Sequence, residues 1–283
     1  MQTPVHLVWL RHDLRVYDNQ ALYTACSAAA YDKGIVLALF IATPLSWNAH
    51  QMAPLRQDLL RRRVLAMQTE LAALNIPLLA VEGTDYTSCA PLIAALLPLG
   101  VKALYAQVEY ELREQRRDQQ VSALLAQQGV AAHWFDRLCI MPPGSIRTQQ
   151  GDIYKVFTPF KRNWLQRLAS DGIQCYPKPT LQMEHAVSLP ALPVMQAPDN
   201  SSANWPVIET EILQRMRDFC QQRVGAYQQD RDFPAIDGTS QLSPYLAIGV
   251  ISAQQCVARL QLEAKEVLWQ EKSGASVWLS ELI

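Results

Sequence analysis

Short apolar runs rich in β-branched residues alternate with longer helical patterns over the first half of the chain. The runs lie at residues 5–10, 35–42, 77–81, 101–106 and 131–136. Between them, residues 54–74 and 110–128 have apolar side chains at helical spacing and charged opposite faces. This alternation predicts an α/β fold, an open, doubly wound, Rossmann-like parallel sheet of five strands flanked by helices.

The pattern changes after residue 136. A turn-rich stretch is followed by an amphipathic helix after Pro159 and then by a long region of little periodicity. Six prolines punctuate that region, at Pro177, Pro179, Pro190, Pro193, Pro198 and Pro206. We therefore expect residues 137–206 to form an interdomain connector of low order with one helix.

A helical pattern begins at residue 207, where Ile208, Ile212, Met216 and Phe219 form one apolar stripe. The pattern continues in apolar helical order to Ile283, with no closing glycine, proline or polar tail. The expected domains are thus an α/β domain at 1–136, the connector at 137–206, and an all-α domain at 207–283 that we expect to be incomplete.

Composition narrows the class of protein. The chain has 283 residues, of which 49% are hydrophobic and 18% charged, as in a globular protein with substantial cores. Its apolar runs are too short to span a membrane. Its first residues do not follow the order of a signal peptide, in which a basic region precedes an apolar region and a cleavage site. The six cysteines form no CxxC pair, so no metal site is expected. We expect a cytoplasmic monomer, and the net charge of −1 gives no general attraction to nucleic acid.

The sheet domain has no glycine-rich nucleotide motif, which argues against a conventional NAD or ATP site. A ligand of such a sheet is expected beyond the carboxyl ends of the strands, where the strand order reverses. Arg11, Asp13 and Arg15 follow the first strand, and we expect them to tie a loop together. The Arg61 to Arg63 run is expected to be a solvated helix face.

A polar turn near residue 240 is the first candidate site. Gly238, Thr239 and Ser240 precede Ser243 and Pro244, which predict a helix N-cap and a first-turn proline. Hydroxyls and free backbone N–H groups there suit a phosphate, although the local pattern alone favours a capped turn without a ligand. Upstream, Arg231 could form a surface ion pair with Asp232 or contact a DNA phosphate, and the local pattern leaves both open.

Four separated segments, in order along the chain, resemble DNA photolyases. They are WLRHDLRVYDNQAL at residues 9–22, YKVFTPFKRNWL at 154–165, GAYQQDRDFPAIDGTSQLS at 225–243 and SVWLSELI at 276–283. The resemblance implies light-driven repair of cyclobutane pyrimidine dimers in UV-damaged DNA by electron transfer from reduced FAD. It implies FAD contacts from Tyr227, Thr239, Ser240, Gln241, Leu242, Ser243 and Trp278. It also implies a DNA contact from Arg231, and a catalytic and DNA-contacting role for Glu281, which hydrogen-bonds the dimer.

The segment YELREQRRD at residues 110–118 resembles the one that holds 5,10-methenyltetrahydrofolate, a light-harvesting antenna, in part of that family. Glu114 matches the folate-binding glutamate, whereas Arg113 departs from the usual asparagine. Without the resemblance, Glu114 would be a solvated helix residue. The other basic clusters are not assigned to DNA: Arg61 to Arg63, Arg116, Arg117, Lys155, Lys161 and Arg162.

The family's remaining flavin contacts and its tryptophan electron relay are expected further along than residue 283. The resemblance therefore predicts a partial, inactive fragment that binds FAD weakly or not at all and repairs nothing. Two alternatives stay open: a cryptochrome-like blue-light receptor, and a non-enzymatic nucleotide-binding remnant. The lesion could also be a (6-4) photoproduct.

Overall fold

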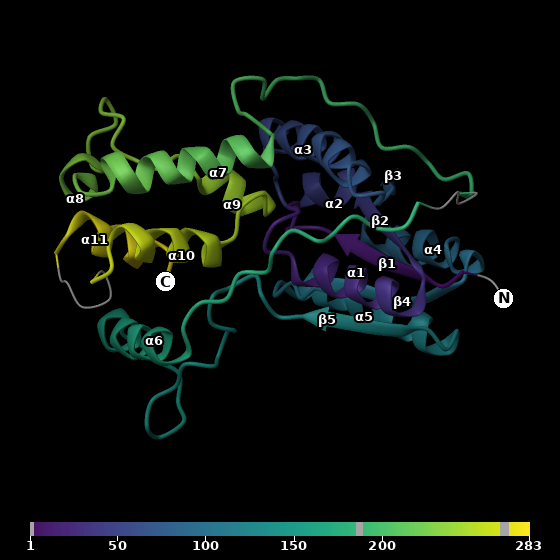
Figure 1. Cartoon of the computed structure of the whole chain (residues 1–283), viewed down its shortest axis with the longest axis horizontal. Coiled ribbons are helices and arrows are strands. Elements are labelled where there is room, and N and C mark those ends of the chain that lie inside the picture. The colour runs from purple at the N-terminus through teal and green to yellow at the C-terminus, as the bar shows by residue number, and fades with distance from the viewer. Residues whose placement is uncertain (1–2, 185–188, 267–271) are drawn as a thin grey trace. The chain divides into compact units, whose positions relative to one another are not determined.

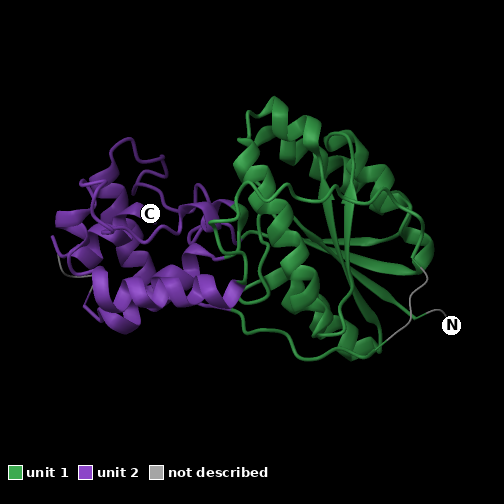
Figure 2. Cartoon of the chain, turned by 90° about the horizontal axis from the view of Figure 1, so that it is seen from above, with its two compact units in different colours: residues 1–136, 176–208, 248–250 green, residues 137–175, 209–247, 251–283 purple. Residues whose placement is uncertain are grey.

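The computed structural model describes residues 3–184, 189–266 and 272–283 and divides the chain into two compact units (Figure 2). Unit 1 comprises Met1–Asp136, Tyr176–Ile208 and Ile248–Val250. Unit 2 comprises Arg137–Cys175, Glu209–Ala247 and Ile251–Ile283. Each unit is thus assembled from segments that are far apart in the sequence.

Unit 1 contains a five-stranded sheet with the order β3-β2-β1-β4-β5, in which all neighbouring strands are parallel (Figure 1). The strands are β1 (Val5–Leu10), β2 (Ile35–Ala42), β3 (Leu78–Glu82), β4 (Val101–Gln107) and β5 (Ala131–Phe135). The predicted fold is confirmed, and every predicted strand end lies within one residue of the observed one. The strand order reverses between β1 and β4.

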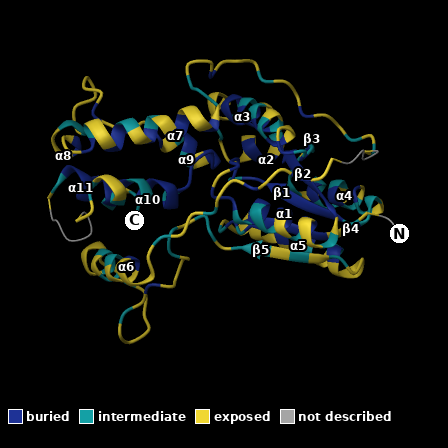
Figure 3. Cartoon of the chain, in the orientation of Figure 1, coloured by how far each residue is buried: buried dark blue, intermediate teal, exposed yellow. Residues whose placement is uncertain are grey.

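Helices cover both faces of this sheet (Figure 1). They are α1 (Gln20–Asp32), α2 (Pro44–Ala49), α3 (Pro54–Ala72), α4 (Cys89–Ala94) and α5 (Leu112–Gln127). Val5, Leu7 and Trp9 of β1 share one buried cluster with residues of α4 and α5, while α1 packs on β1 and β4. Alternate side chains of a strand point to opposite faces of the sheet. Because helices cover both faces, every residue of β1 and β2 is buried (Figure 3).

The proline-rich region does not behave as a free connector, because residues 176–208 belong to unit 1. Val194 forms an antiparallel bridge with Val81, and the Met195 N–H donates to Ala80 O at 3.0 Å. The segment thereby covers the edge strand β3, whose exposed backbone groups could otherwise pair with another chain. The sequence did not predict this role, because the segment pairs with β3 through main-chain groups. Such pairing does not require a regular spacing of hydrophobic side chains.

The Arg61 to Arg63 run of α3 is not a solvated face, so this expectation is wrong. Arg61 and Arg63 are buried, and Arg63 has 0% relative exposure. Arg61 donates to Gln196 O at 3.0 Å, and Arg63 donates to Val207 O at 2.8 Å. The two guanidinium groups thus donate hydrogen bonds to carbonyl groups of the irregular segment 196–207. These carbonyls are not paired in a helix or a sheet and need another donor.

Unit 2 is helical in its described part. Its elements are α6 (Phe157–Asp171), α7 (Glu209–Asp218), a π-helical turn (Phe219–Arg223), α8 (Tyr227–Asp230), α9 (Ser243–Ile248), α10 (Ala253–Glu263) and α11 (Gly274–Glu281). The helix predicted after Pro159 begins at Phe157, two residues before that proline. Pro159 therefore lies in the first turn of α6, where a backbone N–H is not needed. Ser243 is the first residue of α9 rather than its cap, because the carbonyl of Leu242 accepts from Leu246 N–H.

α8 and α11 pack directly on each other in unit 2. A Cβ at Gly274 would lie 2.1 Å from Val224 O, so only glycine allows α11 to start this close to the turn before α8. Phe219 packs between the two helices, with its ring centroid 5.0 Å from that of Trp278 and 5.8 Å from that of Tyr227. The glycine contact and the aromatic cluster together fix the pairing of α8 with α11.

Asp13 and Arg15 hold the loop after β1 together, as predicted, whereas the Arg11 side chain donates hydrogen bonds to Gln107 O and Asp118 outside the loop. Asp13 accepts from the Arg11 N–H at 2.8 Å, and Arg15 donates to Asp18 O at 2.9 Å. Arg15 also donates to the carbonyl of Gly249, a residue of unit 1, at 3.1 Å. Gly249 has φ +74°, and a Cβ there would lie 1.9 Å from His12 O.

Substitution of Gly249 by alanine should therefore be costly for two reasons, a left-handed backbone and an overlap with a carbonyl. We expect Gly249→Ala to lower the free energy of unfolding by about 3 kcal/mol or more. Gly129 is a matched control, because it has φ +69° and nothing within 4 Å of an added Cβ. Gly129→Ala should cost only about 1 kcal/mol. Urea unfolding followed by circular dichroism compares the two, and equal losses would contradict the overlap.

Candidate functional site

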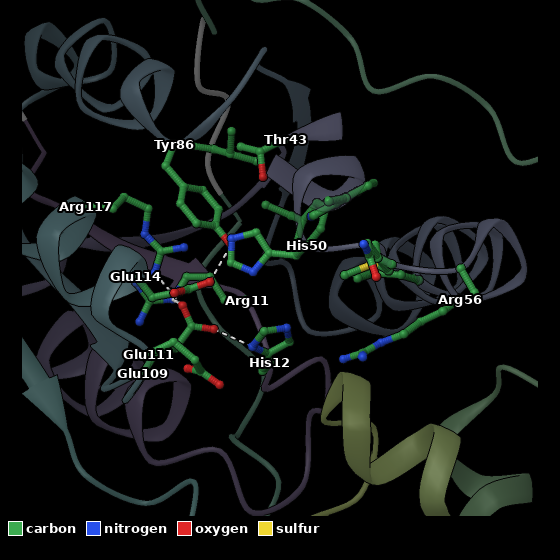
Figure 4. A pocket seen from close by; sticks show the side chains of 17 residues that line it. Arg11, His12, Thr43, His50, Arg56, Tyr86, Glu109, Glu111, Glu114 and Arg117 are labelled. Atoms are coloured by element: carbon green, nitrogen blue, oxygen red, sulfur yellow. Dashed lines mark hydrogen bonds and ion pairs between the residues drawn. The ribbon is translucent and has the colours of Figure 1, made fainter. Parts of the chain in front are cut away.

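A cavity of about 410 Å³ lies beyond the carboxyl ends of the strands of unit 1 (Figure 4). Arg11 and His12 reach it from the loop after β1, Thr43 from the end of β2, and Glu109 from the loop after β4. α3 contributes Arg56, α5 contributes Glu114 and Arg117, and the segments between strands contribute His50, Tyr86 and Glu111. The cavity thus lies where the strand order reverses, as expected for this kind of sheet.

Glu109 is the centre of a buried charge network at the base of this cavity. Its carboxylate lies 2.5 Å from His12 Nδ1, is hydrogen-bonded by Arg117, and lies 3.9 Å from Arg11 Nε. Burial alone would raise the pKa of Glu109, but His12, Arg11 and Arg117 outweigh it and hold this pKa well below its usual range. Burial likewise opposes the charged form of His12, yet Glu109 raises the pKa of His12 above its ordinary value.

Both arginines of the network also stack on Trp9. The Arg11 guanidinium lies 4.3 Å from the Trp9 ring centroid, and that of Arg117 lies 4.8 Å from it. Arg11 further donates to Asp118 at 3.1 Å. The cation–π contacts and the ion pairs fix both side chains, so the base of the cavity is preorganised.

Glu114 lies inside the cavity rather than on a solvated helix face, so the solvated alternative is wrong. Its relative exposure is 4%, and Tyr86 O–H donates to its Oε1 at 2.6 Å. Its Oε2 is buried and accepts no hydrogen bond within the described part of the chain. At the rim, Arg113 Nη1 lies 3.3 Å from His50 Nε2.

The cavity therefore offers a buried carboxylate oxygen without a partner, beside aromatic and cationic side chains. Such an acceptor favours a ligand that presents N–H or O–H donors to it. The sequence predicted a ligand contact here only for Glu114. It gave Arg11 a role in its own loop and did not single out His12, Tyr86 or Glu109. The position of His12 and Glu109 directly after two strands that flank the reversal was the signal that could have found them.

Unit 2 brings four of the predicted site residues together. Tyr227 lies on α8 and Arg231 directly follows it, while Trp278 and Glu281 lie on α11. Arg231 is hydrogen-bonded to Glu281, and its guanidinium carbon lies 5.6 Å from the Tyr227 ring centroid. The hydrogen bond and charge of Glu281 raise the pKa of Arg231, whereas burial raises that of Tyr227. Tyr227 and Trp278 are buried, and Glu281 is about half exposed.

The predicted phosphate-binding turn adjoins this group. Gly238 packs on Asp230, the last residue of α8, since a Cβ there would lie 2.3 Å from Asp230 Cβ. In the turn that follows, Thr239, Gln241 and Ser243 are exposed, while Ser240 and Leu242 are buried. Gln241 has φ +52° and accepts from Arg215 at 2.8 Å. The turn is thus anchored on both sides and presents two hydroxyls to solvent.

Residues 3–184, 189–266 and 272–283 contain neither a metal-binding cluster nor a membrane-spanning helix. No group of three or more His, Cys, Asp or Glu side chains in these ranges is arranged to hold a metal ion. None of the helices in the same ranges has the length and apolar character needed to cross a bilayer.

Comparison with known proteins assigns the family. The DNA photolyase family model matches residues 6–182. The chain is 43% identical to the deoxyribodipyrimidine photo-lyase of Vibrio cholerae, over 99% of this chain and 59% of that protein. It thus spans about three-fifths of the curated photolyases that it matches. It is also 30% identical to an uncharacterized 31.6 kDa Synechococcus protein, over 100% of this chain and 98% of that one.

Solved structures share the fold at low identity. A class III photolyase from Agrobacterium tumefaciens superposes with a TM-score of 0.78 and 23% identity, over 100% of this chain and 57% of that one. A Synechocystis cryptochrome gives a TM-score of 0.77 and 20% identity, over 100% of this chain and 60% of that one. On the strength of the family model, which covers more than half of the chain, this protein belongs to the DNA photolyase family.

Proposed function

We propose that the chain forms the N-terminal part of a flavoprotein that repairs cyclobutane pyrimidine dimers in DNA with light. The observation that carries this proposal is the convergence of Tyr227, Arg231, Trp278 and Glu281 on the paired helices α8 and α11. The relatives named deoxyribodipyrimidine photo-lyases support the substrate class.

In this proposal, Glu281 is the residue that binds the lesion. Its carboxylate is only about half exposed and lies at the end of α11, so it can accept hydrogen bonds from pyrimidine N–H groups. A damaged dimer stacks poorly and leaves the duplex at low cost, which brings those groups within reach. Arg231 would contact a backbone phosphate beside it.

The residues of the turn fit part of FAD. Thr239 and Ser243 offer exposed hydroxyls, and the left-handed Gln241 bends the backbone between them, an arrangement suited to phosphate oxygens. Ser240 and Leu242 would shape the turn from its buried side. Reduced FAD would supply the electron for repair. Tyr227 and Trp278 would border the bound flavin from the aromatic cluster.

The cavity of unit 1 is the proposed antenna site. Its volume of about 410 Å³ lies in the range of small-molecule pockets. The free Oε2 of Glu114 fits the amino and ring N–H donors of a pterin, as in 5,10-methenyltetrahydrofolate. Arg113, which stands where that subgroup has asparagine, lies at the rim beside His50 rather than within the buried base.

Removing the charge of Glu114 should weaken folate binding. We expect Glu114→Gln to lower the affinity for 5,10-methenyltetrahydrofolate about tenfold, since a hydrogen bond to a charged group is worth about 1.5–3 kcal/mol. Glu211→Gln, at an exposed position of α7, is the control and should change nothing. Fluorescence titration of the ligand measures both. Equal affinities of the two variants would contradict the assignment of Glu114.

The repair function is tested with two proteins. The 283-residue chain alone should hold FAD weakly and leave dimers unrepaired, because it spans only 59% of the Vibrio cholerae photolyase and the resemblance implies further flavin contacts in the remainder. A fusion that replaces the matched part of the Vibrio cholerae photolyase with this chain should repair a dimer-containing oligonucleotide under light. Glu281→Gln in the fusion should slow repair about tenfold.

A fusion that binds FAD but repairs no dimer would contradict the proposal and favour a signalling photoreceptor. Light-dependent repair by the chain alone would overturn the expected need for the additional part. A fusion with no flavin at all, next to a chain that binds adenosine nucleotides, would favour a nucleotide-binding remnant.

A further inference from the structure

The ion pair between Arg231 and Glu281 joins two residues with different tasks in the proposed function. Arg231 Nη1 donates to Glu281 Oε1, and Arg231 Nε lies 3.4 Å from Asp232. Across the three described ranges, no other side chain is hydrogen-bonded to the Glu281 carboxylate. The two residues are 50 positions apart in the sequence.

The surrounding packing fixes the pair. Gly274 seats the start of α11 against the Val224 and Gly225 carbonyls, so residue 281 at the far end of α11 comes to the end of α8. On the other side, the Tyr227 ring supports the Arg231 guanidinium. The ion pair is therefore a consequence of the α8–α11 pairing rather than of two flexible surface side chains meeting.

The pair remains open to a competitor. The side chain of Arg231 is 33% exposed and that of Glu281 is 47% exposed, so solvent and an approaching ligand reach both. Ion pairs exposed to this degree are weak and are screened by salt. A DNA phosphate can therefore take over the guanidinium.

We propose that this pair is a latch that couples binding of the DNA backbone to recognition of the lesion. This inference rests on the proposed function. While Arg231 is hydrogen-bonded to Glu281, it blocks the oxygen that the lesion needs. A phosphate that binds Arg231 frees Glu281, and a lesion that binds Glu281 frees Arg231. By reciprocity, each contact strengthens the other. Arg231 is thus a positioning residue for Glu281 as well as a phosphate contact.

The latch predicts an unusual effect of Glu281→Gln on undamaged DNA. Loss of the carboxylate frees Arg231, so the variant chain should bind an undamaged duplex about two- to fivefold more tightly. Its preference for a duplex with one thymine dimer should fall. In the Arg231→Gln background, the same change at residue 281 should give no gain. Fluorescence anisotropy at fixed salt measures all four proteins.

Asp232→Asn is the matched control, because Asp232 is 79% exposed and also lies beside Arg231. It removes the same charge without releasing the Nη1 contact, so its gain should be smaller than that of Glu281→Gln. Equal gains from both changes, or a gain that persists without Arg231, would show a general charge effect and overturn the latch.

A measurement without DNA separates this inference from the proposed function. Inorganic pyrophosphate is titrated while the side-chain Nε–H signal of Arg231 is followed by NMR. The affinity should be about two- to fivefold higher in Glu281→Gln than in the unchanged chain. If this holds and no DNA binds, competition between an anion and Glu281 for Arg231 is confirmed, while the DNA-binding function fails. Equal pyrophosphate affinities overturn the latch whatever DNA does.

Discussion

Burial of β1 on both faces is the constraint on which unit 1 depends. A strand that is covered on both sides has little place for polar side chains. In β1 only one ionisable residue, His6, lies within the strand, hydrogen-bonded to Tyr105, and the other charged residues gather where the strand ends. The order reverses between β1 and β4, and the connections that leave these two strands separate there. Arg11 and His12 after β1 meet Glu109 after β4 across this gap. The charged cavity is thus a product of sheet topology.

Most strands of unit 1 could be predicted from the sequence, because buried parallel strands are continuous apolar runs. The helix α1 was not predicted individually, since alanines lie on its buried face and also at Ala28 and Ala30 outside it, which leaves little hydrophobic contrast between the faces. The arginines of α3 were misjudged for another reason. Their partners are carbonyl groups of residues 196–207, and backbone acceptors far along the chain leave no trace in the local pattern.

The site in unit 2 also depends on contacts between distant segments that the local sequence does not predict. The family segments located Tyr227, Arg231, Trp278 and Glu281, but local physics would have made Trp278 a core aromatic and Glu281 a surface carboxylate. In the structure Trp278 is indeed packed on Phe219, and Glu281 is indeed partly exposed. What no local pattern contains is the Arg231–Glu281 pair. It depends on Gly274, whose missing side chain lets two helices from different segments approach each other.

In the proposed function, the paired helices α8 and α11 face the damaged DNA. Hydrogen–deuterium exchange of the chain with a duplex containing one thymine dimer, and with the same duplex undamaged, tests it most directly. We expect protection of residues 227–231 and 274–281 that is stronger with the dimer. Equal protection by both duplexes, or protection confined to other segments, would contradict it.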